Sequence, residues 1–258
     1  MKVLGVYRAE RFSPNSIERD KAIMDAVMDA VPACEKAIVS ECCLTGSEDA
    51  DVVLTMARSD EALCRLEEME RRGVKVLNSP SGVRSCARAV LDQVMRAEGI
   101  PMPPPDTGNG WWLKRGDAAA QSHEDVTYCA DQAQMERVKK RFNERGITDV
   151  VTSAHVCGDL VKFYGVKGTG FFRTFYPGDT GRTKFGDERM NGTPHHYPYD
   201  IAKLMGSAER LSELTHTPVY GGDCIVEPSG EYRIIDFNDW PSFSPCREEA
   251  ARAIVKLL

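Results

Sequence analysis

The 258-residue sequence has no long hydrophobic run and no excess of positive charge. No stretch approaches the ~18 apolar residues of a membrane-spanning helix, so we expect no membrane partner. The first apolar run, residues 3–7, ends at Arg8 and is too short for a secretory signal. The chain has 33 Lys+Arg against 39 Asp+Glu, a formal charge of −6, and this mild acidity predicts no nucleic-acid partner.

Paired cysteine motifs are also missing. The sequence has nine scattered cysteines and no Cys-x-x-Cys. An odd, scattered set argues against a disulfide scaffold and against a structural zinc site. We therefore expect reduced thiols that pack mostly as small hydrophobic side chains, in a cytoplasmic protein.

Several common catalytic and nucleotide-binding motifs are absent too. The sequence contains neither the glycine-rich phosphate loop that ends in Gly-Lys-Ser/Thr nor the dinucleotide glycine fingerprint. It has no metalloprotease His-Glu-x-x-His, and His155 has no acidic or nucleophilic neighbour in sequence that would suggest a catalytic triad. Any nucleotide must therefore be held by a different device.

Short apolar segments alternate with amphipathic helices through the first third of the chain. This rhythm predicts a small, mostly parallel sheet with helices on its faces. A further helix is predicted over residues 81–98, and the proline-rich residues 101–105 predict a stiff linker. The predicted strands are residues 3–7, 37–40, 52–56 and 74–77, and the predicted helices are residues 17–31 and 60–72.

After the linker the pattern favours antiparallel strands mixed with helices, so the fold class is α/β (α+β). Residues 160–166 and 170–176 form a predicted hairpin around Gly168, and residues 219–227 and 232–238 form a second. The other predicted strands are residues 111–114 and 149–153, and the other predicted helices are residues 132–144, 199–214 and 247–258.

The last hairpin carries the strongest local signal. If Ser229-Gly230 is a two-residue turn, Asp223 lies directly opposite Asp236, about 5 Å away on the same face, where like charges repel. Asn238 points to the same side. Two carboxylates and an amide form an oxygen-rich site suited to Mg²⁺, or to Mn²⁺. An equally good interpretation is a pair of acids that reach solvent or pair with Lys and Arg.

Three cationic residues lie within apolar strand sequences. Lys114 follows Trp111-Trp112-Leu113, while Lys162 and Arg173 each lie between aromatic or aliphatic residues. Because burying an unpaired cation is costly, each must extend to solvent or meet an anion. For a single lysine, a place on an edge strand is the better explanation.

In order along the chain, several segments resemble the ATP-grasp superfamily, over about residues 76–250. The likeness implies an N-terminal α/β lobe with a linker helix (1–105), a small lid lobe (106–157) and a C-terminal lobe with a metal site (158–258), with ATP between the last two. The segments that carry it are Val76-Leu77-Asn78-Ser79-Pro80, Gly99-Ile100-Pro101-Met102-Pro103, Leu113-Lys114-Arg115-Gly116, Val150 to Val156, Tyr220-Gly221-Gly222-Asp223 and Ile235-Asp236-Phe237-Asn238.

The resemblance also implies roles for individual residues. Lys114 and Lys162 would contact the ATP phosphates, and Lys162 and Arg173 would neutralise charge during phosphoryl transfer. Arg88 stands where the family commonly has a nucleotide-binding lysine, and residues 117–122 lack its usual multi-glycine lid. The residues that would meet adenine are Ser153, Ala154, His155 and Val156, and those that would bind Mg²⁺ are Asp223, Asp236 and Asn238.

The activity implied by the resemblance is an ATP- and Mg²⁺-dependent ligase that activates a small-molecule carboxylate as an acyl phosphate for attack by an amine or thiol. A small-molecule kinase, of the kind that phosphorylates inositol phosphates, is the first alternative, and a nucleotide-binding module without turnover is the second. The polar segment 177–197 predicts a mobile loop that orders over the acceptor, with a solvated excursion as the alternative. The sequence identifies neither the acceptor nor the oligomeric state.

Overall fold

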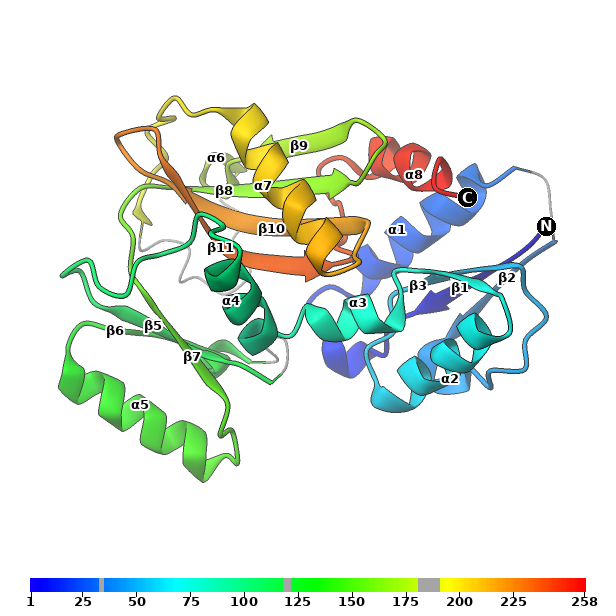
Figure 1. Cartoon of the computed structure of the whole chain (residues 1–258), viewed down its shortest axis with the longest axis horizontal. Coiled ribbons are helices and arrows are strands. Elements are labelled where there is room, and N and C mark those ends of the chain that lie inside the picture. The colour runs from blue at the N-terminus through cyan, green and yellow to red at the C-terminus, as the bar shows by residue number, and fades with distance from the viewer. Residues whose placement is uncertain (33–34, 118–121, 181–190) are drawn as a thin grey trace.

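The computed structural model describes residues 1–32, 35–117, 122–180 and 191–258 (Figure 1). Three sheets follow one another along the chain, and their strands lie within residues 1–105, 106–157 and 158–258, respectively. In Figure 1 the first sheet lies at the right, the second at the lower left and the third above them. The fold class predicted from the sequence, mixed α/β, is confirmed.

The first sheet is parallel throughout, with strand order β2-β1-β3-β4. Its two faces belong to different hydrophobic cores. Helices α2 and α3 cover one face, whereas α1 and the C-terminal helix α8 pack against the other. The elements are β1 (Lys2–Tyr7), α1 (Ile17–Ala30), β2 (Glu35–Ser40), β3 (Val52–Thr55), α2 (Asp60–Arg71), β4 (Lys75–Leu77) and α8 (Arg247–Val255), with 3₁₀ turns at Glu10–Phe12 and Glu41–Cys43.

The single helix predicted over residues 81–98 is wrong, because the chain forms two helices there. Helix α3 (Pro80–Ser85) begins with Ser79 as its cap, and α4 (Arg88–Ala97) begins after the extended residue Ala87. Because of this break, the two helices pack in different hydrophobic cores. Val83 of α3 packs on the first sheet, while Leu91 of α4 packs on the third.

A buried side chain joins the first sheet to the third. Asn78 is fully buried at the end of β4, its amide nitrogen donates to the Val219 carbonyl at 2.8 Å, and its amide oxygen accepts from the Val219 N–H at 3.0 Å. This one side chain therefore bonds both backbone polar groups of Val219, whose carbonyl also accepts from the Trp240 N–H at 3.0 Å. Such a pairing fixes how the two sheets meet.

Replacing Asn78 with Ala is expected to lower the free energy of unfolding by about 1–3 kcal/mol, because it leaves the buried Val219 N–H without its partner and removes one of the two hydrogen bonds to the Val219 carbonyl. Urea denaturation monitored by circular dichroism measures this. The matched control is Asn143→Ala on an exposed turn of α5, which should cost less than about 0.5 kcal/mol. Equal losses in the two variants would contradict the proposed link.

The second sheet has strand order β6-β5-β7 and is covered by helix α5. It is antiparallel, and its core is small. The sequence analysis did not predict β6, a four-residue strand of sequence Val-Thr-Tyr-Cys without a continuous apolar run. The elements are β5 (Trp111–Arg115), a 3₁₀ turn (His123–Asp125), β6 (Val126–Cys129), α5 (Gln132–Glu144) and β7 (Val150–Ala154).

The third sheet, with strand order β11-β10-β8-β9, is also antiparallel. Helices α4 and α7 pack on one face, and α8 lies against strands β8 and β9. The last helix thereby returns to α1, so residues from both ends of the chain share one core. The elements are β8 (Asp159–Val166), β9 (Phe171–Phe175), α6 (Pro177–Thr180), α7 (Ile201–Leu214), β10 (Val219–Val226) and β11 (Tyr232–Asp239).

The predicted mobile loop, residues 177–197, is described only at its two ends, since residues 181–190, with Arg182, Lys184 and Arg189, lie outside the described residues. The described ends have structure. The first forms α6, and near the second the buried Asp159 carboxylate accepts the backbone N–H groups of His195 at 2.7 Å and Tyr197 at 2.9 Å. These ends are anchored to the third sheet, and the lid role stays a prediction.

Two further expectations, on membrane-spanning helices and on cysteines, can be compared with the structure. Within the described part of the chain, no helix is long and apolar enough to cross a membrane. The eight described cysteines are all free thiols, which agrees with the absence of a disulfide framework among them.

Candidate functional site

A cavity of about 750 Å³ lies where the three sheets meet, within the range of small-molecule sites. Its walls include residues from the first sheet's loops, from β5 and β7, and from β8, β10 and β11. All but one of the site residues predicted from the sequence line this cavity. They are Arg88, Lys114, Ser153, Ala154, His155, Val156, Lys162, Asp223, Asp236 and Asn238.

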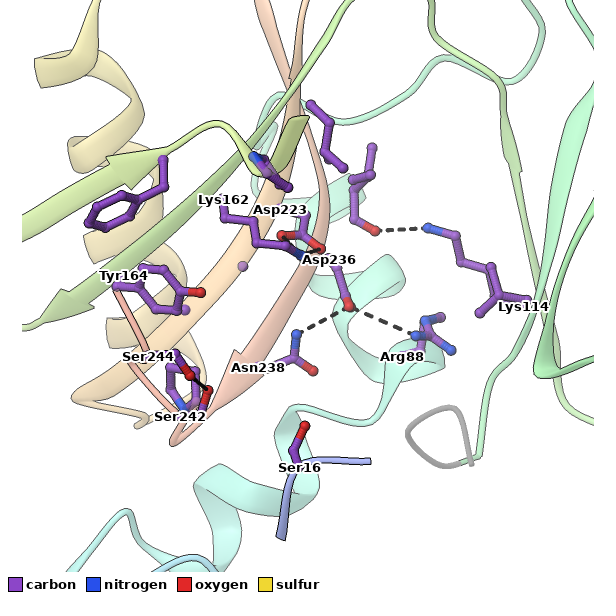
Figure 2. Close-up of a pocket in the computed structure, with 18 of the residues that line it drawn as sticks. Ser16, Arg88, Lys114, Lys162, Tyr164, Asp223, Asp236, Asn238, Ser242 and Ser244 are labelled. Carbon is purple, nitrogen blue, oxygen red and sulfur yellow. Dashed lines mark hydrogen bonds and ion pairs between the residues drawn. The ribbon is translucent and has the colours of Figure 1, made fainter. Parts of the chain in front are cut away.

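The third sheet places three of these residues in one row. Asp223 on β10 is paired in register with Asp236 on β11 and, on its other side, with Lys162 on β8. Cross-strand partners point to the same face, so the two carboxylates and the ammonium group lie together in the cavity (Figure 2). The predicted pairing of Asp223 with Asp236 is confirmed.

The turn that was expected to produce this pairing is different. The hairpin loop has three residues, Pro228 to Gly230, because the Glu227 N–H donates to the Glu231 carbonyl at 2.8 Å. This loop shifts the register by one residue, and a β-bulge at Ile235 shifts it back. Asp236 therefore returns to the cavity face, while Ile234 before the bulge stays in the core.

The bulge also provides a partner for Lys114. Its ammonium group crosses from β5 and donates to the Ile235 carbonyl at 2.9 Å (Figure 2). Burial lowers the pKa of Lys114 to about 8, and the nearby charge of Arg88 adds to this effect against the opposing influence of Asp236 and Asp223. A buried lysine with this pKa sits in a place suited to an anion.

Both acids of the row face cationic groups. Asn238 donates its amide N–H to Asp236 at 3.1 Å, and the Arg88 guanidinium lies 3.9 Å from the same carboxylate. Burial works to raise the pKa of Asp236, but Arg88, Lys114 and Asn238 outweigh it and hold the pKa below its usual value. Lys162 donates to both oxygens of Asp223, at 3.0 and 3.1 Å.

Of the two interpretations left open by the sequence, the structure shows the pairing of these acids with Lys and Arg, and the metal site stays a prediction. They pair with Lys and Arg in this state, and they also line a cavity. No group of three or more His, Cys, Asp or Glu side chains in the described ranges is arranged to hold a metal ion. A metal here would have two carboxylates and one amide from the protein and would need further ligands from another molecule.

The segment predicted to meet adenine, residues 153–156, runs along one wall of the cavity. Its His155 N–H already donates to the Gly110 carbonyl at 2.8 Å, and its carbonyl accepts from the Thr107 hydroxyl at 2.5 Å. The His155 ring is buried, which lowers its pKa, and its Nδ1 accepts from the Trp112 indole at 3.1 Å. The His155 backbone is therefore occupied within the protein.

The structure does not bring Arg173 to this cavity. Its side chain is nearly half exposed at the outer edge of the third sheet, and its Nε donates to Glu249 of α8 at 3.0 Å. In the register of β8 and β9 it lies opposite Tyr164, beyond Lys162 and toward α8. We therefore withdraw Arg173 from the predicted catalytic residues, because an apolar strand context does not specify which end of a strand reaches a site.

Several cavity residues were missed by the sequence reasoning. Trp112 lines the cavity, and its position two residues from Lys114 on one strand already places both side chains on one face. Arg8, Ser16 and Arg58 come from the first sheet's loops. No local pattern marks those three, because they reach the cavity only through the packing of the first sheet against the third.

No family model matches this sequence, and no curated protein does either. Solved structures match it over nearly its whole length. An ATP-grasp RimK domain protein from Sphaerobacter thermophilus DSM 20745 has a TM-score of 0.68 at 17% identity, covering 98% of both chains. The chain has an ATP-grasp fold.

Two ligases of this fold are also similar in structure. A D-alanine–D-alanine ligase from Bacillus anthracis, solved in complex with ATP, has a TM-score of 0.68 at 11% identity, covering 98% of this chain and 94% of that one. The VanG D-Ala:D-Ser ligase from Enterococcus faecalis has a TM-score of 0.67 at 11% identity, covering 99% and 98%. At these identities the ATP-grasp likeness describes the fold.

Proposed function

We propose that the protein is an ATP- and Mg²⁺-dependent ligase that activates a carboxylate as an acyl phosphate for attack by an amine or thiol. The row Lys162–Asp223–Asp236, beside Lys114 and Arg88 in one cavity, is the observation that carries this proposal. The ATP-grasp ligases with a similar fold support the reaction class. In this proposal the second sheet with α5 forms the lid lobe over the nucleotide.

The donor set suits a magnesium ion bridged to phosphates. Mg²⁺ prefers oxygen ligands and commonly takes one or two carboxylates from the protein with the rest from substrate phosphates and water. Asp223 and Asp236 supply the carboxylates, and Asn238 turns its amide nitrogen to Asp236, which leaves its oxygen as the ligand atom. When bound, the ion would neutralise phosphate charge and align the transferred group.

The cationic residues of the cavity would bind the phosphates and the transferred phosphoryl group. Lys114 and Arg88 would bind phosphate oxygens from the side of the second sheet, and Lys162 would leave Asp223 to meet the transferred phosphoryl group. The acceptor carboxylate oxygen would attack the γ-phosphorus as ADP departs. The amine or thiol would then attack the acyl carbon, expelling inorganic phosphate and losing its proton to solvent or base.

A kinase would share the first half of this chemistry but leave the phosphoryl group on a hydroxyl. Incubation with [γ-³²P]ATP, Mg²⁺ and a pool of small carboxylic acids and amines separates the two. We expect label to appear as free phosphate, together with a new amide or thioester. Label retained on an organic product would favour the kinase, and no metabolite-dependent loss of ATP would contradict both.

The pH dependence of ATP binding follows from the environment of Lys114. Its pKa of about 8 in the free protein should rise when phosphates bind, so binding above pH 8 must take up a proton. The ATP dissociation constant, measured by calorimetry in EDTA, should therefore be about tenfold larger at pH 9 than at pH 7.

The matched control for this pH dependence is Lys114→Arg, whose guanidinium stays charged at both pH values. Its ATP affinity should vary little between pH 7 and pH 9. A flat profile for the unmodified protein, or the same slope in Lys114→Arg, would show that Lys114 does not bind the phosphates.

A further inference from the structure

One end of the cavity is formed by the start of α1 and the loop before it, far from β5 in the fold. Phe12, Ser13, Ser16 and Arg19 line it there, and the proposed nucleotide function uses none of them. Ser242 and Ser244, which follow β11, line the same cavity (Figure 2). This end is polar, and Ser13, Ser16 and Arg19 come from the first lobe, which contributes none of the groups paired with Lys114.

Ser16 is the residue that points to a ligand. It is only 9% exposed, its side chain does not cap α1, and its hydroxyl makes no hydrogen bond with a described residue. Figure 2 shows this hydroxyl directed into the cavity. Ser13 is buried to the same degree, and its hydroxyl likewise bonds to no described residue. These two hydroxyl groups are therefore free to donate to a ligand in the cavity.

The backbone adds to this polarity. Ser16 immediately precedes the 14-residue helix α1, whose first amide N–H groups have no intrahelical acceptor. The helix dipole places a partial positive charge at this end. With no side-chain cap at Ser16, the first turn of α1 can donate to an anion in the cavity.

The buried charges at this end balance one another, and an exposed arginine, Arg19, lies at the rim. Arg8 pairs with Asp20 at 3.2 Å and Arg58 with Asp239 at 2.5 Å, and the buried Glu41 carboxylate lies near Arg8. The Nε of Arg58 and both carboxylate oxygens of Asp239 are buried without a hydrogen-bond partner. Arg19, at the rim, forms no ion pair with any described residue. Arg19 is therefore a cation at this end that an anion in the cavity can meet, beside the hydroxyl groups of Ser13 and Ser16.

We propose that this end binds an anionic group of the acceptor, held by Ser16, the first turn of α1 and Arg19. The inference rests on the proposed ligase function, because the acceptor's other end must present the carboxylate that is activated. The acceptor class is thus a small acid with a second anionic group, either a dicarboxylate or an acid that also carries a phosphoryl or phosphonyl group.

Calorimetric titration of the intact protein with matched acids tests this. The probes are the dicarboxylates from malonate to adipate, the monocarboxylates of equal chain length, and 3-phosphonopropionate, each with and without Mg²⁺ and a non-hydrolysable ATP analogue. We expect at least one dianion to bind about tenfold tighter than its monocarboxylate counterpart, because it gains charge-assisted hydrogen bonds. Comparing succinate with 3-phosphonopropionate distinguishes the two kinds of second anion.

Two variants locate the binding. Ser16→Ala should weaken binding of the preferred dianion about fivefold and Arg19→Gln about tenfold, without changing affinity for the ATP analogue. The control is Arg11→Gln, since Arg11 lies over the Phe12 ring and does not line the cavity. Because the Ser16 hydroxyl does not cap α1, Ser16→Ala should also keep the thermal midpoint of the unmodified protein.

The outcomes separate this inference from the proposed function. If the ATP analogue binds but no dianion is preferred over its monocarboxylate, the acceptor class is wrong and the nucleotide site stands. If a dianion is preferred equally in all three variants, its second group binds elsewhere, and the inference fails. If the analogue does not bind, the proposed function fails, and the titrations without nucleotide still decide whether this end of the cavity holds an anion.

Discussion

Replacing Asp236 with Asn is expected to reduce Mg²⁺-dependent ATP turnover by at least about 100-fold while leaving a folded protein. The substitution removes one of the two carboxylates in the row and leaves Arg88 and Lys114 without the charge that now faces them. The measurement is the steady-state rate of ADP formation in saturating Mg²⁺ once an acceptor is known. Before that, the same variant can be followed by Mg²⁺-dependent binding of ATP.

The control for this variant lies on the same hairpin. Glu231 is exposed and pairs with Arg233 outside the cavity, so Glu231→Gln should retain full turnover. Circular dichroism and thermal melting check that Asp236→Asn is folded. Full activity in a folded Asp236→Asn protein would remove Asp236 from the metal site.

Replacing Lys162 or Lys114 with Met should each cost about 1.5–3 kcal/mol of ATP binding, since each removes a charged hydrogen bond to phosphate. The two variants should differ in their response to Mg²⁺ alone. Lys162 occupies both oxygens of Asp223 in the free protein, so Mg²⁺ must displace it. Lys162→Met should therefore bind Mg²⁺ more tightly without nucleotide, whereas Lys114→Met, whose ammonium donates to a backbone carbonyl, should gain less.

Calorimetric titration of each of the two variants, once with ATP and once with MgCl₂, separates the loss of ATP binding from the gain in Mg²⁺ binding. Lys140→Met, on the exposed face of α5, is the matched control and should behave like the unmodified protein in both. Unchanged ATP affinity in both Lys114→Met and Lys162→Met would refute a shared phosphate site. Weaker Mg²⁺ binding in Lys162→Met would contradict the competition for Asp223.

The sequence predicted the fold where periodicity is strong. The parallel β-α-β start, helix Gln132–Glu144 and the two antiparallel hairpins all follow from local apolar spacing. The helix over residues 81–98 was predicted as continuous because periodicity does not reveal that its halves pack on different cores. The Asp223–Asp236 pairing was correct although the loop was one residue longer than expected, because the bulge at Ile235 compensates for it.

Site residues could be predicted from the sequence where a charged residue lies within an apolar strand segment. Lys114 and Lys162 had to reach solvent or meet an anion, and both line the cavity. Arg173 met the same criterion, but the exposed Glu249 provides its anion. Ser16, Arg8 and Arg58 could not be found, because a serine before a helix or an arginine after a strand is common, and only the docking of α1 and α8 between the two sheets brings them to the cavity.

The central claim is that metal-bound ATP lies against the row Lys162–Asp223–Asp236. A crystal structure of the protein with a non-hydrolysable ATP analogue and Mn²⁺ tests it most directly, because anomalous scattering locates the metal. We expect the Mn²⁺ peak between Asp223, Asp236 and Asn238, with the nucleotide phosphates between it and Lys114 and the adenine along residues 153–156. A nucleotide bound in the cavity with its metal elsewhere, or a nucleotide bound outside the cavity, would contradict the account.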